Sequence, residues 1–209
     1  MRTGQRLPRD FLARGPLEVG PALLGATLRH VTPDGTVSVR ITEVEAYAGV
    51  GEDPASHAHR GRTPRNAPMF GAGGVLYVYF SYGMHWCANV VTGQPGHAGA
   101  VLLRAGEVVE GNEVARRRRP TSRRTADLAS GPARLTTALG ITGADDGTDL
   151  CVRSSRLTLW AGRPVDPASI GQGPRVGVSG DGAATPWRFW LVGESSVSRW
   201  RPGGRGTPR

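Results

Sequence analysis

The chain has 209 residues, of which 38% are hydrophobic, and its 26 basic and 17 acidic side chains give a formal net charge of +9. This length fits one domain, and the sequence has neither an apolar stretch of about 20 residues for a membrane span nor the apolar core of a secretory signal. The composition argues against a membrane or secreted protein, and it predicts a cytoplasmic protein whose basic surface meets nucleic acid.

All of the basic residues are arginine, and the chain contains no lysine. A lyase that forms a Schiff base needs an amine, which only the α-amino group of Met1 could supply. The two cysteines, Cys87 and Cys151, are too few for a disulfide scaffold or a four-thiolate zinc site. They lie in apolar runs and are predicted to be core thiols.

The first third of the chain predicts two short helices and a hairpin. Residues 1–9 are basic and expected to be mobile, and helices are expected over residues 10–12 and 16–24. Alternating apolar and polar residues over 26–31 and 36–47 predict a β-hairpin around Pro33-Asp34-Gly35. Residues 48–74 then form a long polar loop, and compact domains rarely keep such a loop unless it is functional.

The rest of the chain predicts mostly strands. Residues 75–80 and 86–91 predict two strands around a tight turn, with Tyr82 near its tip. The later elements are expected as a strand over 98–105, a helix over 107–118, a helix over 130–139 with Ser130 as N-cap, and strands over 151–160 and 187–192. Residues 1–200 are thus expected to form a single domain, and residues 201–209 a disordered basic tail.

Three polar side chains share one face of the strand over 36–47. Glu43, Glu45 and Tyr47 alternate along it, so two carboxylates and a phenol point the same way. A buried carboxylate can accept a proton from an attacking water. An ion pair with a nearby arginine explains the same spacing equally well, and the spacing alone does not separate the two.

The polar loop that follows gathers histidine and arginine. His57 and His59 could bind a metal together with Glu45, although two histidines and one carboxylate are a weak signal. The arginines of this loop are better explained as clamps on phosphate groups. They are Arg60, Arg62 and Arg65.

The aromatic turn over residues 77–86 stands out in a chain with 6% aromatic residues. Most of these rings are expected in the core. A tyrosine at an exposed tip, such as Tyr82, can instead wedge between base pairs, while Tyr47 and Tyr79 can stack on an extruded base. Such stacking is worth about 1–3 kcal/mol per base, comparable to the cost of unstacking.

Several motifs in one order carry a resemblance to a known family. They are Glu43-Val-Glu45-Ala-Tyr47, Arg62-Thr-Pro-Arg-Asn66-x-x-Met69-Phe70, Tyr77-Val-Tyr79-x-x-Tyr82-Gly-Met84, Val101-Leu-Leu-Arg104-Ala, Ser130-Gly-Pro-Ala-Arg-Leu135 and Arg175-Val-Gly-Val178. With them the chain resembles the 3-methyladenine DNA glycosylases of the alkyladenine (methylpurine) type from about residue 16 to residue 192. The resemblance implies a single α/β (α+β) domain with a curved antiparallel sheet, flanking helices and a protruding β-hairpin that intercalates into DNA.

The resemblance also implies roles for individual residues. Glu45 matches the general base, Arg104 matches the arginine that helps to hold the nucleophilic water, and Tyr82 matches the residue that intercalates in place of the flipped nucleotide. The residues matching the base pocket are Tyr47 and Tyr79 as its walls, His57 as the histidine that stacks on and hydrogen bonds to the base, and Asn89 as the asparagine that disfavours a guanine amino group. His57 is preferred over His59 because Ala55-Ser56-His57 resembles the family's approach to that histidine.

The implied activity is base excision by a monofunctional DNA glycosylase. The enzyme would flip an alkylated or deaminated purine out of double-stranded DNA and hydrolyse its N-glycosidic bond, with 3-methyladenine, hypoxanthine and ethenoadenine as candidate bases. No cofactor or metal is implied, and the protein is expected to be a monomer associated with the nucleoid. Two alternatives stay open: a metal-dependent hydrolase or nuclease, and a non-catalytic module that binds nucleic acid.

Overall fold

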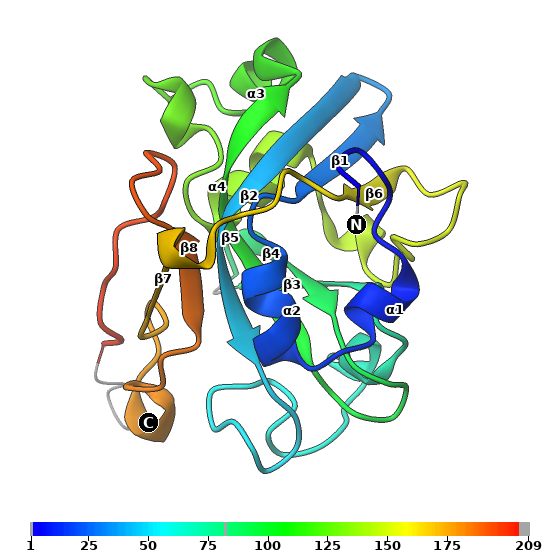
Figure 1. Cartoon of the computed structure of the whole chain (residues 1–209), viewed down its shortest axis with the longest axis vertical. Coiled ribbons are helices and arrows are strands. Elements are labelled where there is room, and N and C mark those ends of the chain that lie inside the picture. The colour runs from blue at the N-terminus through cyan, green and yellow to red at the C-terminus, as the bar shows by residue number, and fades with distance from the viewer. Residues whose placement is uncertain (1, 82, 205–209) are drawn as a thin grey trace.

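One antiparallel sheet organises the fold, as seen in the computed structural model, which describes residues 2–81 and 83–204 (Figure 1). In these residues the sheet has eight strands; six follow the order β3-β4-β5-β2-β1-β6, and β8 pairs with both β2 and β7. The strands are β1 (Thr27–Thr32), β2 (Gly35–Tyr47), β3 (Leu76–Ser81), β4 (His85–Val91), β5 (Ala100–Glu110), β6 (Leu157–Trp160), β7 (Ile170–Gly173) and β8 (Arg188–Leu191). The predicted mixed fold with one antiparallel sheet is therefore confirmed.

The long strand β2 lies at the centre of the sheet. Along one edge its first half pairs with β1 and its second half with β8, and β5 follows its other edge. The register with β5 shifts three times, so that Thr42 on β2 and Val109 and Arg104 on β5 have no directly opposite partner. Such bulges bend a strand and change the direction of a side chain, and they are common beside active sites.

Short helices cover the sheet and connect its strands. The α-helices are α1 (Arg9–Leu12), α2 (Pro16–Ala22), α3 (Asn112–Arg118) and α4 (Pro132–Leu139), and the 3-10 helices are η1 (Ala67–Phe70), η2 (Thr125–Asp127), η3 (Gly143–Asp145), η4 (Pro167–Ser169) and η5 (Gly180–Gly182). Helix α4 packs on β4 and β5, whereas α2 packs on β2 (Figure 1). No helix within the described residues is long and apolar enough to span a membrane.

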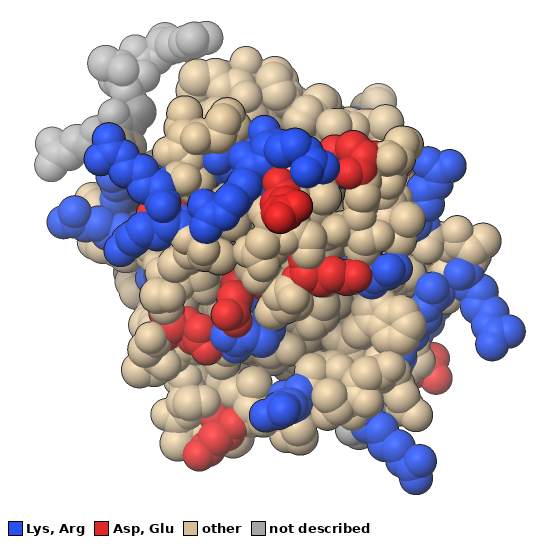
Figure 2. Space-filling view, turned by 90° about the horizontal axis from the view of Figure 1, so that it is seen from above, with Lys and Arg blue, Asp and Glu red and all other residues tan. Residues whose placement is uncertain are grey.

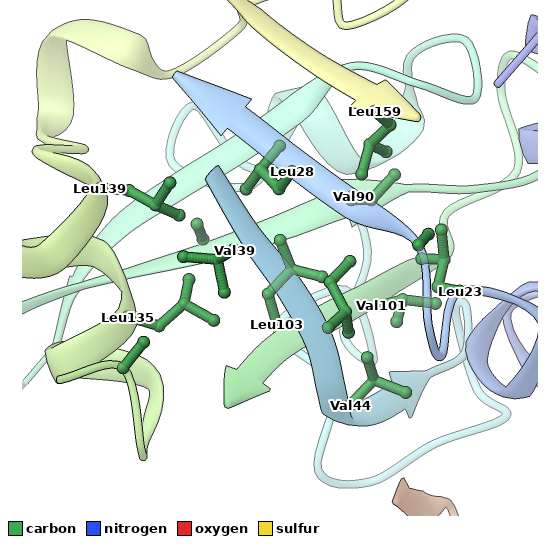
Figure 3. Packing of buried hydrophobic residues seen from close by; sticks show 14 of the residues in the cluster. Leu23, Leu28, Val39, Val44, Val90, Val101, Leu103, Leu135, Leu139 and Leu159 are labelled. Atoms are coloured by element: carbon green, nitrogen blue, oxygen red, sulfur yellow. The ribbon is translucent and has the colours of Figure 1, made fainter. Parts of the chain in front are cut away.

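The core lies between the sheet and these helices. Leu103 and Val39 from the sheet meet Leu135 and Leu139 from α4, and Val44 and Leu23 continue the packing toward α2 (Figure 3). All of these side chains are fully buried or nearly so. Burying each of these side chains stabilises the fold by about 1.5–3 kcal/mol. Strand β2, which carries the polar site residues, is therefore held firmly against the core.

Three of the expected elements differ in the structure, and one strand is additional. Residues 107–110 belong to β5 instead of a helix, because Ser38 of β2 pairs with Glu110 and Gly111, at a φ of 76°, ends the extended segment. Ser130 is not a helix cap: Gly131 holds that position and Pro132 begins α4. The strand expected over 151–160 begins only at Leu157, and β7 was not expected. Cys87 is buried as predicted, but Cys151 is only partly buried.

Part of the N-terminal segment expected to be mobile is attached to the sheet. The backbone N–H groups of Gly4 and Leu7 donate to the carbonyl groups of Ala161 and Leu159, and the Leu7 side chain is buried. These contacts extend the sheet beyond β6. The Gln5 carbonyl also accepts from the N–H of Ala161, so the described part of residues 1–9 is tied to the sheet by three backbone hydrogen bonds.

The surface at the α3 end of the molecule is basic, but its charges are mixed. Figure 2 shows arginine side chains over this face with acidic side chains set between them. Arg118 pairs with Asp34 at 2.6 Å, and Arg124 pairs with Asp127 at 2.9 Å. Exposed pairs of this kind contribute at most about 1 kcal/mol each. The excess of arginine over the whole chain still favours a polyanionic partner.

His30 on β1 makes the stability of the fold depend on pH. Its ring is buried, with Nδ1 donating to the Leu139 carbonyl at 3.0 Å and Nε2 lying 3.8 Å from Asp145. Burial lowers the pKa of His30; Asp145 opposes this effect, and Arg118 and Arg156 add to it. The folded protein thus favours the neutral ring.

We expect the melting temperature to fall as the pH is lowered from about 7 to 5. The unfolded chain takes up a proton near the ordinary histidine value of about 6.5, while the folded chain does not until a lower pH, so stability is greatest above that value. His30→Gln should flatten the curve of melting temperature against pH. The exposed His85→Gln is the control, and parallel curves for both variants and the parent protein would show that His30 is not responsible.

Candidate active site

The carboxylate of Glu45 lies at the end of β2 and is completely buried in the protein. Its Oε1 accepts a hydrogen bond from the backbone N–H of Val176 at 2.6 Å, and its Oε2 accepts one from the Tyr47 hydroxyl at 2.9 Å. It also lines a cavity of about 520 Å³. A fixed carboxylate at the wall of a cavity can orient a water molecule and accept its proton.

Arg104 joins the two carboxylates of β2. Its Nη1 lies 3.2 Å from Oε2 of Glu45, and its Nε donates to Oε1 of Glu43 at 2.9 Å. The bulge at Arg104 is where β5 and β2 shift register, directly beside these two residues. The two carboxylates offset the cost of burying this guanidinium, because charges removed from water need partners of opposite charge, and Arg188 also pairs with Glu43.

Glu43 and Glu45 have different surroundings although they share a strand face. Glu43 accepts from Nε of Arg188 at 2.7 Å as well as from Arg104, and it is not among the residues that line the cavity. Glu45 pairs with a single arginine and faces the cavity. The structure thus assigns the ion-pair interpretation to Glu43, while Glu45 combines an ion pair with access to a ligand.

An aromatic pocket adjoins the cavity of Glu45. It measures about 70 Å³ and shares three lining residues with the larger cavity: Tyr47, His57 and Tyr79. Its full lining is Tyr47, Ala55, His57, Met69, Tyr77, Tyr79 and Asn89. The four residues predicted for a base pocket are therefore brought together, next to the predicted general base.

The phenols of this pocket keep their protons. Burial raises the pKa of Tyr47 well above its ordinary value, and the negative charge of Glu45 raises it further. Burial likewise raises the pKa of Tyr79. Both hydroxyls are therefore neutral hydrogen-bond donors near pH 7, and the Tyr47 hydroxyl uses its proton on Glu45.

His57 is the histidine at the pocket. Its Nδ1 lies 3.0 Å from the Tyr77 hydroxyl, and its ring centroid lies 4.6 Å from that of Tyr79 in an edge-on arrangement. Burial lowers the pKa of His57, and the positive charge of Arg65 adds to this effect, so the ring is neutral near pH 7. His59 lines neither cavity.

Asn89 on β4 contributes an amide group to the lining of the pocket. Its Nδ2 donates to the Tyr77 carbonyl at 3.1 Å, and the side chain is buried. This bond fixes the amide plane. The pairing of Asn89 with Tyr77 on β3 and Leu102 on β5 anchors it in the sheet.

Of the remaining predicted residues, Arg65 lies at the site, and Arg60 and Arg62 line neither of its two cavities. Arg65 lines the larger cavity, with its guanidinium 5.6 Å from the Tyr79 ring centroid. Arg62 lies 6.0 Å from the Phe70 ring, and Arg60 is exposed. Tyr82 lies outside the described residues. Its neighbours Phe80 and Met84 are exposed, with 45% and 65% of their surface accessible.

A buried ion pair behind the site was not predicted. Arg175 donates to both oxygens of Asp53, at 2.6 and 2.8 Å, and to the Ala46 carbonyl at 3.0 Å, and its guanidinium lies 4.6 Å from the Tyr47 ring centroid. Arg175 directly precedes Val176, whose N–H contacts Glu45. The pair therefore joins the polar loop after β2 to the segment that holds the carboxylate.

Two further points concern residues whose importance the sequence did not reveal. Tyr77 was expected in the core, and it is buried, but its hydroxyl also contacts His57. Ser198 contacts Glu43 with both its N–H and its hydroxyl.

Among the described residues no group of three His, Cys, Asp or Glu side chains is arranged to hold a metal ion.

An aromatic pocket beside a buried carboxylate and guanidinium has the shape and the groups that hydrolysis of a bond to a flat ring needs, and the strongly basic chain points to a nucleic-acid substrate. The family model for methylpurine-DNA glycosylase matches residues 10–195. The chain belongs to this family and is a DNA glycosylase, a hydrolase of DNA repair.

Similar proteins from bacteria support this assignment. The chain is 55% identical to a protein of Streptomyces avermitilis over 93% of this chain and 92% of that protein, and 57% identical to one of Nocardia farcinica over 92% and 90%. A protein of Burkholderia lata is 48% identical over 93% and 92%. All three are provisionally named 3-methyladenine DNA glycosylases.

Proposed function

We propose that the protein excises 3-methyladenine and related damaged purines from duplex DNA after flipping the damaged nucleotide into the aromatic pocket. The observation that carries this proposal is the position of Glu45, at the wall of a cavity that shares Tyr47, His57 and Tyr79 with the pocket. A base held between these rings would bring its sugar toward the carboxylate. Base flipping is required because the bond to be broken is inaccessible in a stacked duplex.

The chemistry is hydrolysis with Glu45 as general base. A water held by Glu45 and Arg104 attacks the anomeric carbon of the deoxyribose, Glu45 takes the proton, and the bonding electrons leave with the base. The transition state resembles an oxocarbenium ion, so the negative charge of Glu45 also stabilises it. The absence of lysine from the sequence favours water over an amine as nucleophile, which leaves an abasic site in an intact strand.

The pocket favours purines that have been alkylated or deaminated. Tyr47 and Tyr79 provide aromatic faces for stacking, and the neutral ring of His57 adds a hydrogen-bonding edge without repelling a cationic base. A purine alkylated at N3 already carries positive charge and leaves easily. Hypoxanthine and ethenoadenine are neutral and need more help from the site, so their excision is expected to be slower. Asn89 is proposed to disfavour the amino group of guanine.

The test is a glycosylase assay with duplexes that each contain one lesion: 3-methyladenine, hypoxanthine, ethenoadenine or 7-methylguanine. We expect base release that persists in EDTA and breaks the strand only after heat or alkali. Loss of activity in EDTA would support a metal-dependent hydrolase instead. Binding to DNA without release of any base would support a non-catalytic module, and strand cleavage without heat or alkali would contradict a monofunctional enzyme.

DNA contact is proposed to involve the β3–β4 turn and the loop before β3. Tyr82 would occupy the gap left by the flipped nucleotide, and Arg60, Arg62 and Arg65 would contact backbone phosphates. The exposed Arg60 and the position of Arg65 at the cavity support this assignment. The protein is proposed to act as a monomer bound to the nucleoid.

Tyr82→Ser should weaken binding to lesion-containing duplex by about 5- to 150-fold, because one stacking contact of about 1–3 kcal/mol is lost. A fluorescence titration with lesion and undamaged duplex measures this change. Met84→Ser, in the same exposed turn, is the control and should have a smaller effect. Equal affinities of Tyr82→Ser and the parent protein for lesion duplex would rule out the intercalating role.

A further inference from the structure

The C-terminal segment returns to the candidate active site after β8 has ended. We define residues 196–203 as the C-terminal strap; it begins after residue 195, the last residue matched by the family model. In Figure 1 it is the orange-to-red segment that runs beside β7 and β8. Its first anchor is buried, where the hydroxyls of Ser196 and Thr42 lie 2.8 Å apart.

Ser198 is the second anchor, and it contacts the charged residues behind Glu45. Its N–H donates to Oε2 of Glu43 at 2.6 Å, its hydroxyl donates to Oε1 of Glu43 at 2.9 Å, and its carbonyl accepts from Nη2 of Arg188 at 2.9 Å. The same hydroxyl oxygen accepts from Nη2 of Arg104 at 3.4 Å. One serine thus contacts three charged side chains, and one of them is the arginine that pairs with Glu45.

A third anchor joins the strap to the other side of Glu45. The carbonyl of Arg201 accepts from the N–H of Gly177 at 3.0 Å, directly after the residue whose N–H contacts Glu45. Gly203 packs so closely that a Cβ at this position would lie 2.4 Å from the Val178 carbonyl oxygen. Gly177 and Val178 line the large cavity. The strap therefore contacts both groups that hold the carboxylate, the Arg104 guanidinium and the Val176 segment.

We propose that the C-terminal strap assembles the active site, and that Ser198 is a positioning residue that holds Arg104 and Glu43 so that Arg104 is directed at Glu45. The proposal rests on the proposed function, since it takes Glu45 and Arg104 as the groups that hold water. The physical reason is that Glu43 and Glu45 compete for one guanidinium. Ser198 supplies two of the hydrogen bonds that satisfy Glu43, so Arg104 can keep Nη1 on Glu45.

Ser198→Ala tests this role through the rate of the chemical step. It removes one hydrogen bond to a carboxylate and one to a guanidinium, and we expect single-turnover base release to fall roughly tenfold or more. Affinity for lesion duplex should change less than twofold, because Ser198 is not among the residues lining the cavity.

Matched variants separate positioning from general damage. Ser195→Ala, at an exposed residue three positions earlier, should match the parent protein. Ser198→Thr keeps the hydroxyl and should recover most of the rate. Gly203→Ala should displace the third anchor and slow base release while Ser198 is intact. Thermal unfolding of each variant checks that the fold is retained.

The outcomes distinguish this proposal from the proposed function. If the parent protein releases damaged bases and Ser198→Ala does so at the rate of Ser195→Ala, the strap does not position the site, and the glycosylase mechanism stands. If the threonine variant is as slow as the alanine variant, the hydroxyl is not the important group. If the parent protein releases no base from any lesion duplex, the proposed function itself is wrong.

Discussion

Glu45→Gln is expected to keep binding to lesion-containing duplex and to lose base release by about 10²–10⁴-fold, the usual contribution of a general base. The substitution removes the proton acceptor and the negative charge but conserves shape. The Gln carbonyl oxygen can still accept from the N–H of Val176, and Arg104 keeps its partner Glu43. The loss should therefore appear in the chemical step and not in folding or DNA affinity.

Single-turnover excision and a binding titration on the same duplex separate these quantities. Glu52→Gln is the matched control, since it makes the same change of charge at an exposed residue in the loop after β2. It should release bases as fast as the parent protein. A Glu45→Gln enzyme that released 3-methyladenine at a rate close to that of the control would assign the proton transfer to another group.

The hairpins of the fold could be predicted from the sequence because their contacts are local. The alternation over residues 36–47 and the turn at Gly35 describe β1 and β2 without knowledge of the rest of the chain. The segment 107–110 could not be assigned in the same way. Its Glu-Val-Val-Glu pattern suits a helix or a strand, and pairing with β2, about 70 residues away, decides between them.

The candidate site, like the fold, could be predicted where its contacts are local and not where they join distant parts of the chain. Alternation placed Glu43 and Glu45 on one face of β2, but it could not say which one faces a ligand. The partners that distinguish them, Arg188 and Ser198, lie 145 and 155 residues further along the chain. The resemblance to the family's motifs predicted that Tyr47, Tyr79 and Asn89 are neighbours, and all three line one pocket. Contacts between polar residues far apart in the chain leave no periodic pattern in the sequence. The contacts of the C-terminal strap and the Arg175–Asp53 ion pair could therefore be identified only from the structure.

Arg175→Met is expected to lower the free energy of unfolding by about 3–5 kcal/mol, because it leaves the carboxylate of Asp53 buried without its cation. Asp53 is 1% exposed, and the N–H groups of Ala48 and Ala55 are its other partners. For a chain of this size each kcal/mol corresponds to about 2–4 °C, so the melting temperature should fall by roughly 6–20 °C.

The double variant Arg175→Met with Asp53→Asn shows whether the orphaned charge is the cause. It removes the carboxylate together with its partner and should recover part of the lost stability, whereas independent effects would add. Arg163→Met, at an exposed arginine, controls for the loss of positive charge. If Arg175→Met had the same melting temperature as this control, the Arg175–Asp53 ion pair would not stabilise the fold. Because Arg175 lies against Tyr47 and directly precedes Val176, a destabilised variant should also release damaged bases more slowly below its melting temperature.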